Sequence, residues 1–288
     1  MYRSFSLIPF LLIITAWTFL GSCSSTPNPG QDAHFLSHFS YSGKYLDISG
    51  ETGNARATFW KPDGSMLYVA DRGTHAVVAY ALQEPWEVHT ATFTHKISVP
   101  GEFQHGLFLH PEGYRMWVFN RTCILSFTLA EAWDITSVIE NSNMCMDYIL
   151  EQAHDLEFSP DGSRLFIDDR NNAALFAFDL HTPWEITTAK LAYTMDLSEI
   201  QQEVRGTEFA KNGTVLLMMD TGRDEVLEFQ LSTPYDISTA VFVNTLDVSK
   251  QTLQGRGLSI NATETSVYVT GRNEGKIFQY DLSTSPGQ

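Results

Sequence analysis

A short motif recurs along the chain about every fifty residues, and this periodicity constrains the fold more than any other feature. Its clearest copies begin at Phe59, Phe108 and Phe158, where an apolar segment, a Pro-Asp-Gly or Pro-Glu-Gly turn and a second apolar segment follow one another. Degenerate copies begin at Phe209 and Ile260. The turns fall at positions 64, 113, 162, 213 and 264. Such a period indicates a repeat architecture in which each unit is one supersecondary element.

Each repeat contains four short segments of β character separated by turn signals. In the third repeat these segments are residues 155–158, 164–168, 174–180 and 191–197. A second signature, an aromatic residue followed by an acid and a branched residue, separates the third and fourth segments at Trp86, Trp133, Trp184 and Tyr235. Four strands per fifty-residue repeat are typical of β-propeller blades.

The two ends of the chain complement each other. The last repeat stops after a third-strand segment, residues 277–282, and lacks a fourth strand. Residues 39–49 have the pattern of the fourth-strand segments 191–198 and 241–249. Pairing this N-terminal segment with the last repeat would remove an open sheet edge. The sequence therefore predicts an all-β fold, a five-bladed β-propeller of four-stranded blades over residues 39–288, closed by its N-terminal strand.

Residues 1–22 have the pattern of an export signal. Arg3 precedes an apolar run, residues 7–20, whose 14 residues are fewer than the roughly 20 that span a bilayer. The run ends in Leu20-Gly21-Ser22-Cys23, which resembles the lipobox of bacterial lipoproteins. That resemblance implies cleavage before Cys23, acylation of this residue and, because Ser24 follows it, anchoring in the outer membrane, facing the periplasm or the cell surface. Residues 23–38 would be the lipidated cysteine and a flexible tether; an ordinary secretory signal is the alternative.

The repeats are also similar to a known group of bacterial propellers. The Pro-Asp-Gly-Ser stretches from Pro62 and Pro160 resemble the Tyr-Val-Thr-Asn and lactonase-like β-propeller repeats, and Tyr268 begins the related tetrapeptide Tyr-Val-Thr-Gly. The Pro-Trp-Glu-Ile element at Trp184 resembles repeats of bacterial propeller lipoproteins. The resemblance implies the fold, whereas propellers host many unrelated activities.

Aligning the repeats on the turn reveals two sets of basic residues. The first set stands eight residues before the turn and comprises Arg56, His105, His154, Arg205 and Arg256. The second stands eight residues after it and comprises Arg72, Arg121, Arg170 and Arg272. In a propeller both positions reach the same mouth of the central channel. Guanidinium groups there would hold carboxylates, sulfates or phosphates.

A structural latch between blades is the alternative, and on the sequence alone it is the favoured one. One residue before the second set stand Asp71, Asn120, Asp169 and Asp220, each a candidate partner for the arginine of a neighbouring blade. An arginine repeated in most units suits a latch, because a ligand site usually breaks the symmetry.

Blades two, three and four carry the residues that break the symmetry. Asp155 adjoins His154, and Glu157 and Glu208 replace the Phe or Ser of other repeats. These three acids are the candidate catalytic residues, because paired carboxyl groups perform acid–base chemistry on glycosides. His105 and His154 are candidate ligands of a divalent metal, the cofactor that this pattern would bind.

Two structural features are also predicted. Cys123 and Cys145 begin the third strand and lie on the fourth strand of blade two, where antiparallel pairing and export favour a disulfide. The repeated Trp86, Trp133, Trp184 and Tyr235 are predicted to cap blade edges, with a sugar-stacking rim as the alternative.

The charge balance bears on function. The chain has 34 acidic and 18 basic residues, a net charge of −16, which excludes a general nucleic-acid binder because phosphate binding needs a basic footprint. The sequence favours a lipid-anchored, extracytoplasmic binding or protein-interaction module without catalysis. Its partners would be the membrane and a protein, a small anion or a carbohydrate. A lactonase-like or glycosidase-like hydrolase and a lectin-like carbohydrate binder are the alternatives.

Overall fold

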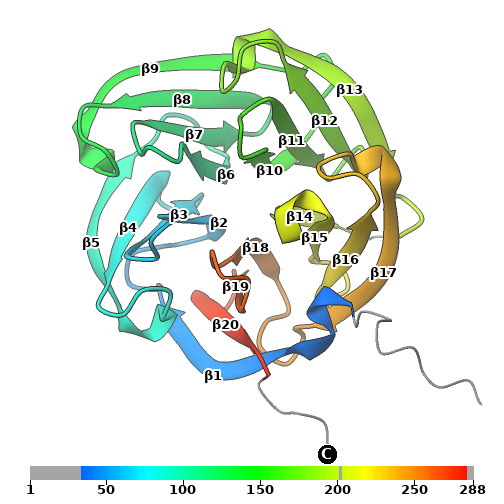
Figure 1. Ribbon diagram of the computed structural model, residues 1–288. Coiled ribbons are helices and arrows are strands. Elements are labelled where there is room, and N and C mark those ends of the chain that lie inside the picture. Colours follow the sequence, from blue (N-terminus) through cyan, green and yellow to red (C-terminus); the bar gives the residue numbers. More distant parts are fainter. Residues whose placement is uncertain (1–33, 201–202, 284–288) are drawn as a thin grey trace, which may run out of the picture. The chain divides into compact units, whose positions relative to one another are not determined.

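A computed structural model describes residues 34–200 and 203–283. In these residues the chain forms five four-stranded antiparallel sheets, arranged as blades around a common centre (Figure 1). The predicted signal segment, Cys23 and most of the predicted tether lie outside the described residues. Within the described part, none of the helices combines the length and the apolar character of a membrane span.

The first three blades follow one another in the chain, each from its innermost to its outermost strand. Blade 1 comprises β2 (Ala55–Trp60), β3 (Met66–Asp71), β4 (Ala76–Leu82) and β5 (Ala91–Ser98). Blade 2 comprises β6 (Gln104–Leu109), β7 (Arg115–Asn120), β8 (Cys123–Leu129) and β9 (Val138–Cys145). Blade 3 comprises β10 (Ala153–Phe158), β11 (Arg164–Asp169), β12 (Ala174–Leu180) and β13 (Ala189–Asp196).

The last two blades include both ends of the described chain. Blade 4 comprises β14 (Val204–Ala210), β15 (Val215–Asp220), β16 (Glu225–Leu231) and β17 (Ala240–Asp247). Blade 5 comprises β18 (Gly255–Ile260), β19 (Ser266–Gly271), β20 (Lys276–Leu282) and β1 (Phe39–Asp47). Short 3-10 helices are η1 (Phe35–His38), η2 (Val88–Thr90), η3 (Ile135–Ser137), η4 (Ile186–Thr188), η5 (Lys211–Gly213) and η6 (Ile237–Thr239).

Strand β1 closes the ring. It pairs antiparallel with β20, with Phe39 opposite Leu282 and Asp47 opposite Lys276. Each innermost strand contacts the innermost strands of the two blades beside it, in the cyclic order β2, β6, β10, β14 and β18 (Figure 1). The predicted five-bladed propeller with an N-terminal closing strand is therefore confirmed.

The hydrophobic core lies between the blades. Five clusters of buried apolar side chains each span two neighbouring blades, so that every interface of the ring has its own core. Between blades 2 and 3, for example, the rings of Trp117 and Phe158 have centroids 4.9 Å apart. Burial of apolar surface is the main favourable term in such packing, so each blade depends on both neighbours.

The repeated aromatic residues cap the blades, as predicted. Trp86, Trp133, Trp184 and Tyr235 all have positive φ, and each ring packs on the turn glycine of its own blade. A Cβ added to Gly162 would lie 2.2 Å from the Trp184 ring. This contact explains why glycine and aromatic residue repeat together.

The predicted disulfide between Cys123 and Cys145 is present. The two residues are directly opposite each other in the pairing of β8 with β9. The bond therefore ties the outermost strand of blade 2 to the strand that begins two residues after Arg121.

Removal of β1 should destabilise the whole ring. We expect a chain beginning at Gly50 to unfold at a much lower temperature than one beginning at Ala33, because the buried side chains of Phe39 and Leu46 alone contribute about 3–6 kcal/mol. Thermal unfolding followed by circular dichroism measures this. Equal melting temperatures for the two chains would show that strand closure contributes nothing to stability.

Candidate functional site

The first set of basic residues converges at one end of the central channel. Each member is the second residue of an innermost strand: Arg56, His105, His154, Arg205 and Arg256. Since these strands run side by side around the centre, the five side chains share one level of the ring. All five are no more than 9% exposed. The structure thus brings together the ring that the sequence predicted.

The two histidines form a stacked pair. The centroids of His105 and His154 are 4.5 Å apart and their planes differ by 7°. His105 Nδ1 lies 3.1 Å from the carbonyl oxygen of Ala153, and Arg205 Nη1 lies 2.6 Å from His154 Nε2. Burial, with the charges of Arg56 and other arginines, lowers the pKa of His105 to about 3. Burial also lowers the pKa of His154. Both imidazoles are therefore neutral at neutral pH.

The three arginines of this ring place positive charges close together in a buried position, and several of their N–H groups have no hydrogen-bond partner in the described residues. Nε and Nη1 of Arg56, the same atoms of Arg256 and Nε of Arg205 are buried without a hydrogen-bond partner in the described residues. Burial, followed by the charges of Arg256 and Arg205, holds the pKa of Arg56 far below its ordinary value. Burial with the charge of Arg205 has the same effect on the pKa of Arg256. Buried charges without counter-charges cost free energy.

Glu203 forms ion pairs with arginines at this end of the channel. One carboxylate oxygen lies 2.7 Å from Arg205 Nη2 and the other lies 2.5 Å from Arg170 Nη2. Arg256 Nη2 instead donates to the side-chain oxygen of Gln254. Glu203 thus pairs with Arg205 and Arg170, whereas Arg56 and Arg256 form no ion pair among the described residues.

The second set of basic residues lies at the same mouth. Arg72 and Arg121 both approach one aromatic ring, with their guanidinium carbons 4.5 and 5.8 Å from the centroid of Phe103. The charges of Arg72 and Arg272 also act on Arg56. Together with Arg170, they extend the cationic region outward from the buried ring.

Three of the partners that the latch interpretation proposed are engaged within their own blades. Both carboxylate oxygens of Asp71 accept from backbone amides of its own blade, including that of Asn54. Asp169 accepts from the amide of Glu151 in the same way, and Asn120 accepts from that of Phe103. The loops that enter the innermost strands expose amides that the nearest side-chain oxygen satisfies. These oxygens are consequently occupied by backbone and do not hold neighbouring arginines.

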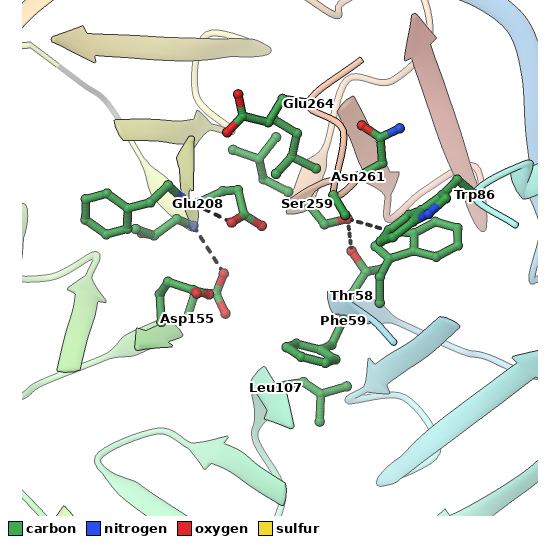
Figure 2. A pocket seen from close by; sticks show the side chains of 16 residues that line it. Thr58, Phe59, Trp86, Leu107, Asp155, Glu208, Ser259, Asn261 and Glu264 are labelled. Carbon is green, nitrogen blue, oxygen red and sulfur yellow. Dashed lines mark hydrogen bonds between the residues drawn. The ribbon is translucent and has the colours of Figure 1, made fainter. Parts of the chain in front are cut away.

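The acids occupy a cavity toward the other end of the innermost strands. This cavity, of ≈ 250 Å³, is lined by Asp155, Glu157 and Glu208 together with aromatic and hydroxyl side chains. Figure 2 shows Asp155 and Glu208 on one side and Trp86 across from them. Asp155 is anchored to the next blade, since its Oδ2 accepts from the amide of Thr207 at 3.1 Å.

Burial changes the protonation of these acids. It raises the pKa of Glu208 to about 8, and with the charge of Glu208 it raises the pKa of Glu157 well above its usual range. Burial with the nearby Asp168 raises the pKa of Asp155. A carboxyl group that is protonated at neutral pH can act as a general acid.

The predicted metal ligands His105 and His154 lie side by side, but the predicted acids do not join them. In the described ranges, no group of three or more His, Cys, Asp or Glu side chains is placed to hold a metal ion. His154 and Glu157 are three residues apart on β10 and therefore lie at different levels of the channel. The histidines belong to the cationic end, whereas the acids line the cavity.

Two residues of the site escaped the sequence analysis. Asp168 is fully buried, and its Oδ1 accepts from the amides of His154 and Asp155 while its Oδ2 accepts from the hydroxyl of Thr207. Glu203 bridges two arginines. Both are acids at repeat positions where the other blades have none, so the same symmetry comparison would have revealed them.

Comparison with known proteins supports the fold. No protein-family model matches the chain, and no curated protein matches it. Among solved structures, a luciferin-regenerating enzyme is 12% identical with a TM-score of 0.54, over 85% of this chain and 97% of its own. A protein of unknown function from Desulfotomaculum acetoxidans is 11% identical (TM-score 0.45, 75% of this chain). A 6-phosphogluconolactonase-like protein of Bacteroides uniformis is 14% identical (TM-score 0.48, 77% of this chain). The chain spans 62% and 65% of the last two. At these identities the likeness concerns the β-propeller fold alone.

The raised pKa of Glu208 predicts a pH-dependent stability. Because the folded state holds this proton up to about pH 8 and the unfolded chain releases it near the ordinary value, stability falls as pH rises between the two. The maximal slope is about 1.4 kcal/mol per pH unit.

Urea unfolding at about pH 5 and about pH 8 tests this. Glu208→Gln should flatten the dependence, whereas Glu140→Gln, on the exposed part of β9, should leave it unchanged. An unchanged slope in Glu208→Gln would show that this carboxyl group titrates normally.

Proposed function

We propose that this chain is a binding module that holds a small oxyanion at the cationic end of its central channel. The observation that carries the proposal is the group of buried guanidinium N–H donors on Arg56, Arg205 and Arg256 that have no acceptor in the described residues. A bound oxyanion would supply both the acceptors and the counter-charge, and guanidinium groups match its geometry.

Electrostatics favour a local site over a general attraction. The whole chain carries a net charge of −16, so its long-range field repels anions. Nevertheless, the charges of Arg72, Arg170 and Arg272 act on Arg56 or Arg256 and have the same sign. An anion would therefore be held by contacts within the channel mouth, where charge-assisted hydrogen bonds are strongest.

Binding is better supported here than hydrolysis in the acidic cavity. Oxygens of the acids already accept backbone hydrogen bonds: Asp155 accepts from two amides and Glu208 from that of Phe209. Carboxyl groups also relieve burial by taking up a proton, which a guanidinium cannot do by losing one. Of these two described sites, the cationic end is the one that keeps a charge for a ligand to neutralise.

Removal of one guanidinium should abolish anion-dependent stabilisation. In the Cys23→Ser form of the mature chain, phosphate, sulfate or citrate at 100 times its dissociation constant should stabilise the fold by about 2.7 kcal/mol, a rise of roughly 5–10 °C in melting temperature. Arg56→Met should lose this response. Without anions it should be at least as stable as the parent, because the substitution removes repulsion from Arg205 and Arg256.

Arg115→Met is the matched control, since Arg115 lies over Trp117, away from the channel mouth. It should retain the full response to anions. If the parent shows no response and Arg56→Met merely melts earlier, Arg56 has a structural role and the proposal fails.

We further propose that the propeller is exported and anchored through a lipid on Cys23. The lipobox resemblance supports this, and the disulfide between Cys123 and Cys145 is consistent with an oxidising compartment. The binding mouth would then face the periplasm or the exterior.

Replacement of the anchor residue tests this placement. In a bacterial host, the parent chain should partition with membranes and its N-terminal peptide should carry the mass of the acyl groups. Cys23→Ser should remain soluble. A parent chain that is cleaved, unacylated and soluble would identify an ordinary secretory signal instead.

A further inference from the structure

The hydrogen bonds of the stacked histidines determine which of their nitrogens carries a proton. A guanidinium group donates and never accepts. Arg205 Nη1, which lies 2.6 Å from His154 Nε2, therefore makes this nitrogen an acceptor. In the neutral imidazole the proton is then on Nδ1, which is buried without a partner in the described residues. His154 thus adds another donor to the ring.

His105 has the opposite arrangement. Its Nδ1 lies 3.1 Å from the carbonyl oxygen of Ala153, and a carbonyl group accepts and never donates. Nδ1 therefore carries the proton, and Nε2 presents a lone pair. This nitrogen has no partner among the described residues, and His105 is 1% exposed.

An isolated acceptor is unusual among so many donors. The free groups of Arg56, Arg205 and Arg256 are all N–H donors. The charges of Arg56, Arg72 and Arg205 all act on His105 and oppose its protonation. Both oxygens of the nearby Glu203 are engaged by arginines. His105 Nε2 is thus the unoccupied acceptor of the ring.

We infer that the anion held here carries a hydroxyl group, which it donates to His105 Nε2 while its oxygens accept from the arginines. This inference rests on the proposed function. The ligand class is an oxyanion with one O–H, as in hydrogen phosphate or a hydroxycarboxylate. Sulfate and simple carboxylates have no such proton at neutral pH and would leave the buried acceptor unsatisfied, which should weaken binding about ten- to hundred-fold.

Two pairs of anions that differ in this hydroxyl group test the inference. Titration calorimetry on the mature Cys23→Ser chain, at neutral pH and constant ionic strength, would compare phosphate with sulfate and glycolate with acetate. We expect the hydroxyl-bearing member of at least one pair to bind at least tenfold more tightly. If only phosphate is preferred over its partner sulfate, the ligand is a phosphate. If only glycolate is preferred over its partner acetate, the ligand is a hydroxycarboxylate.

Variants at His105 distinguish the role of its Nε2 acceptor from the role of its stacked aromatic ring. His105→Phe retains an aromatic ring against His154 but has no acceptor, so the preference should fall to near unity while sulfate affinity changes little. His105→Gln supplies a side-chain carbonyl and should restore part of the preference. His110→Phe, a histidine that packs on Trp184 outside the ring, should behave as the parent chain.

The outcomes distinguish the two proposals. If none of the four anions binds, the proposed function fails. If both members of each pair bind equally to the parent chain, or if His105→Phe keeps the preference, the cationic site stands and the role of His105 is overturned.

Discussion

Closing a ring with only five blades forces the innermost strands close together, and the rest of the structure depends on this approach. A Cβ added to Gly257 would lie 2.4 Å from the carbonyl oxygen of Arg56, and one added to Gly206 would lie 2.9 Å from that of Arg256. Neighbouring backbones are therefore almost in contact at this level. Because the centre is so narrow, the side chains one residue earlier are confined together and shielded from water. The buried cationic ring is a direct consequence of ring closure.

The same strands carry basic side chains at one end and acidic side chains at the other, and the two kinds of group respond differently to burial. Glu157 and Glu208 can take up protons, and burial raises their pKa values accordingly. The guanidinium groups of Arg56 and Arg256 have no comparable way to become neutral. The protonated acids of the cavity need no counter-charge. At the cationic end, buried N–H groups of the arginines remain without hydrogen-bond acceptors among the described residues. This difference in chemistry is the reason why we propose the binding site at the arginines.

Much of this molecule could be predicted from the sequence because its features repeat. The turn period, the complementary ends and the register of Cys123 with Cys145 follow from local patterns that each blade restates. The position of the basic ring could also be predicted from the repeats. The partners of Asp71 could not, because a carboxylate in a short loop accepts from whichever backbone amides the loop leaves free. The bridge made by Glu203 depends on side-chain reach between blades, which repeat alignment does not contain.

The placement of the histidines in the ring explains how repetition and a specific site coexist. The three arginines come from blades 4, 5 and 1, which are consecutive around the ring, and the histidines come from blades 2 and 3 (Figure 1). With arginine at all five positions, the ring would bury two more positive charges and would present only hydrogen-bond donors to a ligand. With His105 and His154, one arc of the ring carries charge and the other is a neutral stacked surface with a single free acceptor. The fivefold repeat forms the enclosed channel. The two histidines, which stand where the other repeats have arginine, make one side of the ring chemically different from the other, so that an asymmetric ligand can bind in one orientation.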